Sequence, residues 1–347
     1  MLVSVTGGTG FVGAHSVAAL ARAGHRVRLH VRDAANVERA LAPLGVDSAT
    51  VERVVVGDVT DEMSVAKAVR GTDAVLHAAA VYSFDSRYHS AMRRTNQRGA
   101  EVVLSAARRT GADPIIHVSS VAAMLPCAGR VLHEHTPPGA AREPYMASKA
   151  AAERVARDHQ RQGAPVVITY PPALLGPHDP NLGDQNARLR DALRGLVPMW
   201  PSGGFPIGDV RDTAALHAAV LTAPRDGTDR HFGPGRYLST RAYVRLLREV
   251  TGRPLPAAVL PAAAMLPVGL LADRLQRFWP WHLPAEYGAI YTCACAARVA
   301  DHASTLGLVS RPPAQTVADT VHWLYQQGHV SARRAGRAAV PSSPVQV

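Results

Sequence analysis

The first third of the chain alternates short apolar runs with longer segments of helical periodicity. The apolar runs are "LVSVTG", "RVRLHV", "RVVVGDV", "AVLHAAA" and "IIHVSS", and amphipathic stretches such as "AHSVAALARAG" and "NQRGAEVVLSAARRTGA" separate them. Apolar runs that alternate with helical segments are typical of a parallel sheet covered by helices. The pattern therefore predicts an α/β fold with a doubly wound parallel sheet and right-handed crossovers.

Beyond residue 170 this alternation loosens. The stretch "GLVPMWPSGGFPIGDV" is rich in loop residues, whereas "STRAYVRLLREVTG" has the pattern of a capped helix. We expect a doubly wound domain over residues 1–170, to which part of 205–235 crosses back, and a smaller mixed lobe over 171–330. The basic segment 331–347, rich in Ser, Pro and Arg, is predicted to be a disordered tail.

An apolar run of 18 residues, "LPAAVLPAAAMLPVGLLA", raises the question of a membrane span. Three prolines interrupt this run, namely Pro256, Pro261 and Pro267. Because prolines break helices and no flanking signature supports insertion, we predict a buried or lid-like helix and no transmembrane segment. The aromatic residues Phe278, Trp279 and Trp281 would suit lipid docking or a pocket wall, with core packing as the default expectation.

Composition and charge narrow the classes of protein only slightly. The 347-residue chain is 47% hydrophobic and 19% charged, and it starts without the charged segment and cleavage site of a signal peptide, so we expect a cytoplasmic globular protein. The net charge of +11 suits a phosphate-bearing cofactor, a nucleic acid or a membrane surface, but no aromatic-interleaved basic stripe favours nucleic acid. Cys127, Cys293 and Cys295 lack the spacing of a disulfide framework or a metal site, so we expect reduced, inert thiols and no metal.

A glycine-rich turn joins the first predicted strand to the first helix in "VSVTGGTGFVGAHSVAAL". Gly8, Gly10 and Gly13 fit G-x-G-x-x-G, and Gly7 with the latter two fits the wider G-x-x-G-x-x-G. Glycine lets the backbone approach a pyrophosphate, and the helix N-terminus supplies amide donors. The context predicts a dinucleotide-binding Rossmann domain over residues 1–170 with a mainly substrate-binding lobe after it.

The end of the second predicted strand, "RVRLHVRD", bears on the choice of dinucleotide. An acidic residue there would bind the ribose 2′-hydroxyl, whereas an arginine favours a 2′-phosphate. Counting from the preceding turn puts Val31 at the usual acidic position, with Arg32 at the strand end and Asp33 beyond the ribose. The sequence therefore favours NADP(H) over NAD(H). Asp58, at the end of the third strand, would accept a hydrogen bond from the adenine amine or cap the next helix.

Tyr145 and Lys149, in "YMASKAAAERV", lie four residues apart and so share one face of a predicted helix. A neighbouring ammonium would lower the pKa of the phenol and allow proton transfer near neutral pH. The strand "IIHVSS" places Ser119 and Ser120 at the carboxyl end of the sheet, where ligands bind in such folds. One serine hydroxyl could then hydrogen-bond a substrate oxygen, while the other terminates the strand.

These segments together resemble the extended short-chain dehydrogenases/reductases, which have the NAD(P)-dependent epimerase/dehydratase fold. The resemblance is strongest to dihydroflavonol-reductase-like and 3β-hydroxysteroid-dehydrogenase-like members. It rests on "VTGGTGFVG", "GHRVRLHVRD", "GDVTD", "AVLHAAA", "RTNQRGAEVVL", "HVSSVAA", "EPYMASKAAAE", "YPPALLGPHDP" and "GDVRDTAALHAA", and covers about residues 1–330. Tyr170-Pro171-Pro172 departs from the family's Arg-Pro, which puts local cofactor contacts in question.

The resemblance implies a role for individual residues. Tyr145 would be the acid/base, Lys149 would lower its pKa and bind the nicotinamide ribose, and Ser120 would polarise the reacting oxygen. Asn96 would position a water in the proton relay or, alternatively, hold a helix kink. The remaining cofactor contacts would be Gly7, Gly10, Phe11, Val12, Gly13, Arg32, Asp58, Val59, Ala78, Ala79, Ala80 and Pro171.

We therefore expect an NAD(P)H-dependent oxidoreductase that transfers a hydride between nicotinamide and a carbonyl or alcohol of a small, hydrophobic substrate. Expected substrate contacts are Tyr82, Phe84, Met124, Leu175 and Trp200. A nucleotide-sugar epimerase or dehydratase with retained NAD is the first alternative, and basic residues that could serve its phosphates are Arg188, Arg190 and Arg194. A non-catalytic dinucleotide-binding protein is the second, and the resemblance makes a homodimer plausible.

Overall fold

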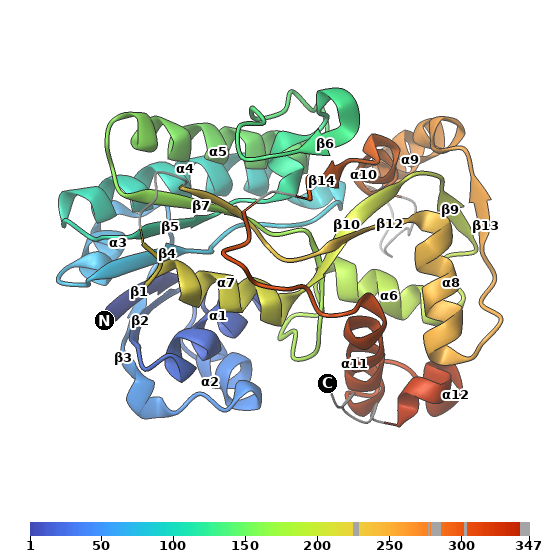
Figure 1. Cartoon of the computed structure of the whole chain (residues 1–347), viewed down its shortest axis with the longest axis horizontal. Coiled ribbons are helices and arrows are strands. Elements are labelled where there is room, and N and C mark those ends of the chain that lie inside the picture. Colours follow the sequence, from blue (N-terminus) through green and yellow to red (C-terminus); the bar gives the residue numbers. More distant parts are fainter. Residues whose placement is uncertain (225–228, 277, 279–285, 302–303, 341–347) are drawn as a thin grey trace.

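A seven-stranded parallel sheet forms the centre of the protein (Figure 1). The computed structural model describes residues 1–340 except 225–228, 277, 279–285 and 302–303. The strand order is β11-β7-β5-β4-β1-β2-β3, and every neighbouring pair is parallel. The strands are β1 (Leu2–Thr6), β2 (Arg26–Val31), β3 (Val51–Val56), β4 (Ala74–His77), β5 (Ile115–Val118), β7 (Val166–Tyr170) and β11 (Arg230–Phe232). The prediction of a doubly wound α/β fold is confirmed.

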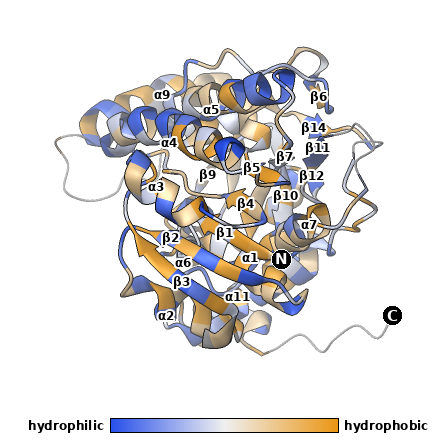
Figure 2. Ribbon diagram, turned by 90° about the vertical axis from the view of Figure 1, so that its left-hand side faces the viewer, coloured by the Kyte–Doolittle hydropathy of each residue, from blue (hydrophilic) through white to orange (hydrophobic). Residues whose placement is uncertain are grey.

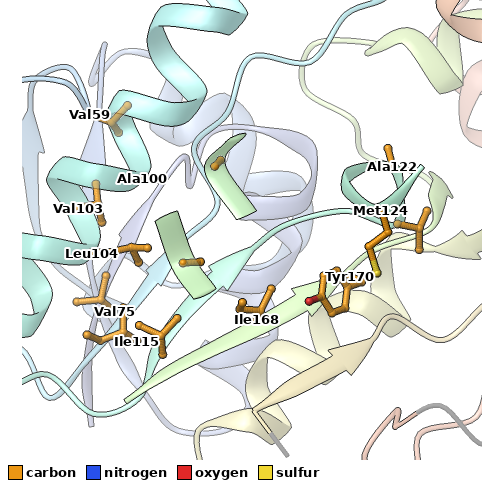
Figure 3. Close-up of a cluster of buried hydrophobic side chains, with 14 of the residues drawn as sticks. Val59, Val75, Ala100, Val103, Leu104, Ile115, Ala122, Met124, Ile168 and Tyr170 are labelled. Carbon is orange, nitrogen blue, oxygen red and sulfur yellow. The ribbon is translucent and has the colours of Figure 1, made fainter. Parts of the chain in front are cut away.

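Helices cover both faces of this sheet (Figure 1). One layer consists of α1 (Phe11–Arg22), α2 (Asn36–Leu41) and α7 (Val210–Val220), and the other of α3 (Glu62–Val69), α4 (His89–Arg109) and α5 (Pro144–Arg161). Successive strand residues point to opposite faces, so Ile115 joins the core under α4 and α5 while Ile116 joins the core over α1. Figure 3 shows the first of these cores, and Figure 2 shows the hydrophobic strands β1 and β4 between the helical layers.

The C-terminal lobe is built from small sheets and helices beside the carboxyl ends of the central strands. Its sheets pair β8 (Ala173–Leu175), β10 (Gly204–Asp209) and β12 (Arg236–Ser239); β9 (Met199–Pro201) and β13 (Ala258–Leu260); and β6 (Val131–Leu132) and β14 (Arg298–Val299). Its helices are α6 (Asp184–Arg194), α8 (Thr240–Thr251), α9 (Ala262–Gln276), α10 (Tyr287–Cys295) and α11 (Pro313–Gln326). Short 3-10 turns are η1 (Ala42–Leu44), η2 (Ser48–Thr50), η3 (Ser86–Tyr88), η4 (Val121–Met124) and η5 (Ala128–Arg130).

A carboxylate cap fixes the start of α5. Glu143 accepts the backbone N–H groups of Tyr145 at 3.0 Å and Met146 at 2.8 Å, and Pro144 occupies the first helical position. Capping groups satisfy amides that otherwise have no partner, and proline suits this position because it lacks an N–H. The cap therefore sets where the first turn of α5, with Tyr145, lies.

Residues 332–339 differ from the disordered tail predicted for 331–347, of which residues 341–347 lie outside the described part of the chain. Residues Ala332–Ala335 form α12 and Gly336–Ala339 form the 3-10 turn η6. Ala335 and Ala338 are buried in the core of the C-terminal lobe, and the carbonyl of Arg334 accepts a hydrogen bond from Arg253 at 2.7 Å. Two alanines three residues apart give this short segment an apolar face, which an average over a basic composition conceals.

The apolar run at residues 255–272 was predicted to form a buried or lid-like helix, and the structure contradicts the buried alternative. The run divides into β13 and α9, and among the described residues no helix is both long enough and apolar enough to cross a membrane. One face of α9 is exposed, and Phe278 is 87% exposed rather than packed in the core. Trp279 and Trp281 lie outside the described residues.

Candidate active site

The glycine turn brings three backbone segments into close contact. Gly7 has φ +74°, and a Cβ on it would lie 2.7 Å from the Cα of Ala79, while a Cβ on Gly13 would lie 2.0 Å from the carbonyl oxygen of Gly7. Gly10 differs, because a Cβ there would meet only that same oxygen, at 3.4 Å, and would otherwise face open space. Gly7 and Gly13 are thus needed for packing, whereas Gly10 keeps a surface clear.

That surface is the floor of a cavity of about 350 Å³ at the carboxyl ends of the central strands. The glycine turn and the N-terminus of α1 form one part of its wall, and α5 contributes Tyr145 and Lys149. The predicted site residues that line it together are Gly7, Gly10, Phe11, Val12, Gly13, Ala78, Ala80, Ser120, Tyr145, Lys149 and Pro171, with Tyr82 and Phe84. Ala79 lies against Gly7. The structure therefore brings the glycine turn and the side chains of Ser120, Tyr145 and Lys149 into one cavity.

Tyr145 is nearly buried at the centre of this group. Its ring makes edge contacts with Tyr82, at 4.7 Å between centroids, and with Phe84, at 5.5 Å. Burial raises the pKa of Tyr145 above its ordinary value, and a hydrogen bond with Ser120 opposes this effect. The direction is opposite to the lowered pKa that the Tyr-Lys spacing suggested, so the phenol stays protonated and can donate.

Lys149 is buried beside Tyr145, and its Nζ donates to the carbonyl oxygen of Val118 at 3.1 Å. Burial lowers the pKa of Lys149 to about 8, and the Glu153 carboxylate works in the opposite direction. At neutral pH, Lys149 is therefore an ammonium in most molecules. Burial, together with this charge, lowers the pKa of His77 to about 3, so the imidazole at the end of β4 is neutral.

Tyr170, which stands where the family has the Arg of Arg-Pro, is hydrogen-bonded to charged side chains of α5. The Tyr170 hydroxyl donates to Glu153 Oε1 at 2.6 Å, and Arg157 Nε donates to the same oxygen at 2.7 Å. All three side chains are buried, and Glu153 lies one turn after Lys149. A guanidinium is thus present next to the end of β7, but it comes from α5 rather than from the position that is Arg in the family's Arg-Pro.

Asn96 does not line the cavity. Its Oδ1 accepts from Val81 N at 2.8 Å, and its Nδ2 donates to Val81 O at 3.0 Å and to Ser148 Oγ at 3.0 Å. The buried amide thereby ties the loop after β4 to α4 and α5. These bonds give Asn96 a structural role that differs from the helix kink considered above, and the relay role stays a prediction.

The residues predicted to contact the adenosine lie beyond the cavity, at the ends of β2 and β3. Arg32 is exposed, and its charge helps to lower the pKa of Asp58, after the larger effect of the hydrogen bonds from Thr60. Asp33 accepts the backbone N–H of Ala35 at 2.9 Å, so its carboxylate closes a turn. Val59 is buried in the core against α4.

Three predicted substrate residues belong to the hydrophobic core instead of the cavity wall. Met124 is fully buried under the sheet, and Leu175 and Trp200 pack in the core of the C-terminal lobe. Leu174, the neighbour of Leu175 in β8, lines the cavity. Adjacent strand residues face opposite sides, so a one-residue error in register selects the wrong side chain.

Several lining residues were not expected from the sequence. They come from separate segments of the C-terminal lobe and of the loops around it, and include Leu125, Asn181, Gln185, Pro206, Thr292 and Ala297. Gln185 Nε2 donates to the Tyr82 hydroxyl at 2.8 Å, which links α6 to the loop after β4. For Gln185, the one signal in the sequence was a polar residue in the first turn of a helix. Such residues are too common to mark a site.

The three arginines considered for substrate phosphates have protein partners. Arg188 pairs with Glu286 and lies 5.5 Å from the centroid of the Phe84 ring. Arg190 pairs with Asp191, and Arg194 donates to the carbonyl oxygen of His329. None of the three lines the cavity.

Comparisons with known proteins agree with this geometry. Residues 3–233 match the model of the NAD dependent epimerase/dehydratase family. Sterol demethylase protein B of Methylococcus capsulatus is 28% identical over 95% of this chain and 100% of its own length, and a putative dihydroflavonol 4-reductase of Synechocystis is 29% identical over 94% and 95%. A solved nucleoside-diphosphate-sugar epimerase from Pseudomonas aeruginosa shares the fold with a TM-score of 0.74, at 21% identity over 95% of this chain and 99% of its own. The resemblance to extended short-chain dehydrogenases/reductases is confirmed, and the chain belongs to the NAD dependent epimerase/dehydratase family.

Proposed function

We propose that this protein is an NAD(P)H-dependent oxidoreductase that interconverts a carbonyl and an alcohol on a small hydrophobic substrate. The observation that carries the proposal is that Gly10, Ser120, Tyr145 and Lys149 line the same cavity. A phosphate cradle and a proton donor that open on the same space suit a reaction between a dinucleotide and a second molecule.

The residues present fit a nicotinamide dinucleotide. The open space above Gly10 and the N-terminus of α1 suit a pyrophosphate, and Lys149 is placed to hold ribose hydroxyls through its ammonium group. When bound, the cofactor supplies or accepts the hydride.

The chain's own residues would hold the reacting oxygen and move its proton. The hydroxyls of Ser120 and Tyr145, which hydrogen-bond each other, would both point at the substrate oxygen and stabilise charge that develops there. Tyr145, protonated in its buried setting, would donate its proton to the forming alcohol, and the Lys149 ammonium would stabilise the phenolate that remains. Asn96 acts as a positioning residue, because it fixes the loop that carries Tyr82.

The substrate side of the cavity supports an apolar molecule. Apolar side chains of the wall include Phe84, Leu125, Leu174, Phe205 and Pro206. Two relatives are named for a sterol and for a dihydroflavonol. The partnered arginines of α6 weigh against a nucleotide-sugar substrate, which would need free cations for its phosphates.

The direct experiment measures oxidation of NADPH and NADH by the purified chain against a panel of aldehydes, ketones and steroids, with Tyr145→Phe as the matched variant. Phenylalanine keeps the ring that contacts Tyr82 and Phe84 but removes the proton, so turnover should fall by about 10²–10⁴-fold while NADPH binding persists. Turnover by the variant at the parental rate would contradict the proposed role of Tyr145. Cofactor that stays bound through purification would favour the epimerase alternative.

We also propose that the cofactor is NADP(H). Arg32 follows β2 with an exposed guanidinium, and the carboxylate of Asp33 is engaged in a turn. Arg32→Ala should weaken NADPH binding by about tenfold or more and leave NADH binding nearly unchanged, because only NADPH carries a 2′-phosphate. Equal losses for both dinucleotides in a binding titration would contradict this assignment.

A further inference from the structure

Helix α9 exposes an apolar face although it belongs to a folded lobe. Val268 and Leu271 are each 56% exposed, Leu275 is 50% exposed, and Leu270 is 46% exposed. The first three follow one another at spacings of three and four residues, so they form a continuous stripe along the helix. A monomeric soluble protein seldom leaves such a stripe uncovered.

The opposite face of α9 is the one that packs on the protein. Ala262, Gly269 and Gln276 are buried at intervals of seven residues. A Cβ on Gly269 would lie 2.9 Å from Tyr287 Cα, so glycine permits close contact between α9 and α10. Because both faces of α9 are largely apolar, the exposed stripe cannot be explained as the solvent side of an ordinary amphipathic helix.

The exposed charges near this helix are positive. Arg274 is exposed on α9 itself, and Arg87 lies in η3, which contacts α9. Arg93 and Arg94 are exposed in the first turns of α4, directly after η3, and Arg142 is exposed close to Tyr287 of α10.

The acidic residues of the same segments are covered and engaged. Asp85 is buried and pairs with Arg87, and Glu286 is buried and pairs with Arg188. Glu143 is buried as the cap of α5, and Asp273 accepts the N–H of Tyr287 at 3.3 Å. The charge presented to solvent around α9 is therefore supplied by arginine.

We propose that the exposed face of α9 docks on the surface of an anionic lipid bilayer. An apolar stripe flanked by cations is what binds helices to such surfaces in the plane of the interface, and a net charge of +11 adds long-range attraction. A second copy of the chain is a poorer partner, because a twofold contact would place the same arginines against each other. Helix α9 lies at the periphery of the molecule in both views (Figure 1 and Figure 2).

Helix α9 packs beside the apolar side of the cavity through the face opposite its exposed stripe. Thr292 on α10 and Phe84 just before η3 both line the cavity, and α9 contacts both of these elements. Docking would bring that wall to the membrane, where an apolar substrate dissolves. This last step rests on the proposed function, whereas docking itself does not.

The test is flotation of the purified full chain with phosphatidylcholine vesicles that contain either no anionic lipid or about one third phosphatidylglycerol. The chain should float with the anionic vesicles, and added salt should reduce the bound fraction. Leu271→Glu should lower binding by about tenfold, because a carboxylate then faces the anionic surface. Leu196→Glu is the matched control: Leu196 is also 56% exposed, but it follows α6, and this variant should float like the parent.

Three results would overturn the proposal. They are failure of the parent chain to float with anionic vesicles, flotation of Leu271→Glu at the parental level, and light scattering that shows a dimer which Leu271→Glu converts to a monomer. The last result would assign the face to a second copy. Equal thermal unfolding temperatures would confirm that both variants are folded. Flotation is measured without nicotinamide or substrate, so vesicle binding by a chain that oxidises no NADPH would contradict only the proposed function.

Discussion

The two walls of the cavity are built in different ways. The wall around Gly10, Ser120, Tyr145 and Lys149 comes from short motifs in which a strand ends or a helix begins. The opposite wall takes apolar side chains from distant segments, for example Leu125, Leu174, Phe205 and Ala297. The first wall depends on local backbone geometry and on which functional groups follow it, whereas the second depends on how the lobe packs. The chemistry of the site is therefore encoded more locally than its specificity.

The largest expected effect concerns the first wall. Lys149→Met should reduce kcat/KM for carbonyl reduction by about 10²–10³-fold, because it removes the ammonium that stabilises the Tyr145 phenolate. Lys67→Met changes the chain's other lysine, which is exposed on α3, and should leave kcat/KM at the parental value. Similar losses in both variants, measured by steady-state kinetics, would contradict the specific contribution of Lys149 to the first wall.

The glycine turn gives the next effect, on stability. Gly13→Ala should lower the free energy of unfolding by about 3 kcal/mol, since the added Cβ would lie 2.0 Å from the Gly7 carbonyl oxygen. Gly10→Ala is the matched variant and should cost less than about 1 kcal/mol, because its Cβ faces open space. Urea denaturation measures both values, and equal costs would mean that the turn is packed differently.

A pH profile distinguishes the two ionisable groups of the first wall. The pKa of Lys149 is lowered to about 8, so its ammonium is present below this pH and is lost as pH rises through it. We expect kcat/KM for NADPH to be constant at pH values about one unit or more below this pKa and to fall by about tenfold per unit well above it. Lys149→Arg keeps its charge at high pH, so any residual activity should lack this decline. A decline in that variant at the same pH would assign the titration to another group.

The smallest expected effect concerns the second wall. Leu174→Ala should raise KM for an apolar substrate by about threefold to tenfold with kcat little changed, because the side chain lines the cavity. Leu175→Ala instead removes a side chain from the core of the C-terminal lobe and should destabilise the fold with little change in KM. The reverse pattern in kinetics and thermal unfolding would show that β8 has the other register.

Much of the first wall could be predicted from the sequence, and little of the second. The glycine turn, the serine pair after β5 and the Tyr-Lys pair on α5 each combine a local conformation with a functional group, so position along the chain implies position in the site. Leu175 and Trp200 were expected at the substrate because their segments follow or face the crevice, but the position of a segment does not say which of its side chains enter the core, where these two lie.

The direction of the Tyr145 pKa shift and the exposure of α9 also could not be predicted from the sequence. The spacing of Tyr145 and Lys149 suggested a lowered phenol pKa, but the spacing contains no information on burial, which raises it. In the same way, an apolar run allowed a buried helix where α9 has an exposed face, and a basic composition predicted disorder for a segment, 331–347, of which residues 332–339 are folded. Whether each of these segments is buried depends on which residues pack against it in the folded chain.

The central claim is that the glycine turn and the Tyr145–Lys149 face serve one bound dinucleotide. Calorimetric titration of NADPH into the parent chain and into Gly10→Ala tests it most directly, because this Cβ enters the cavity and leaves the packing of the turn intact. We predict that NADPH binds the variant at least about tenfold more weakly while the thermal unfolding temperature without ligand stays the same. Unchanged NADPH affinity in a folded variant would contradict the claim.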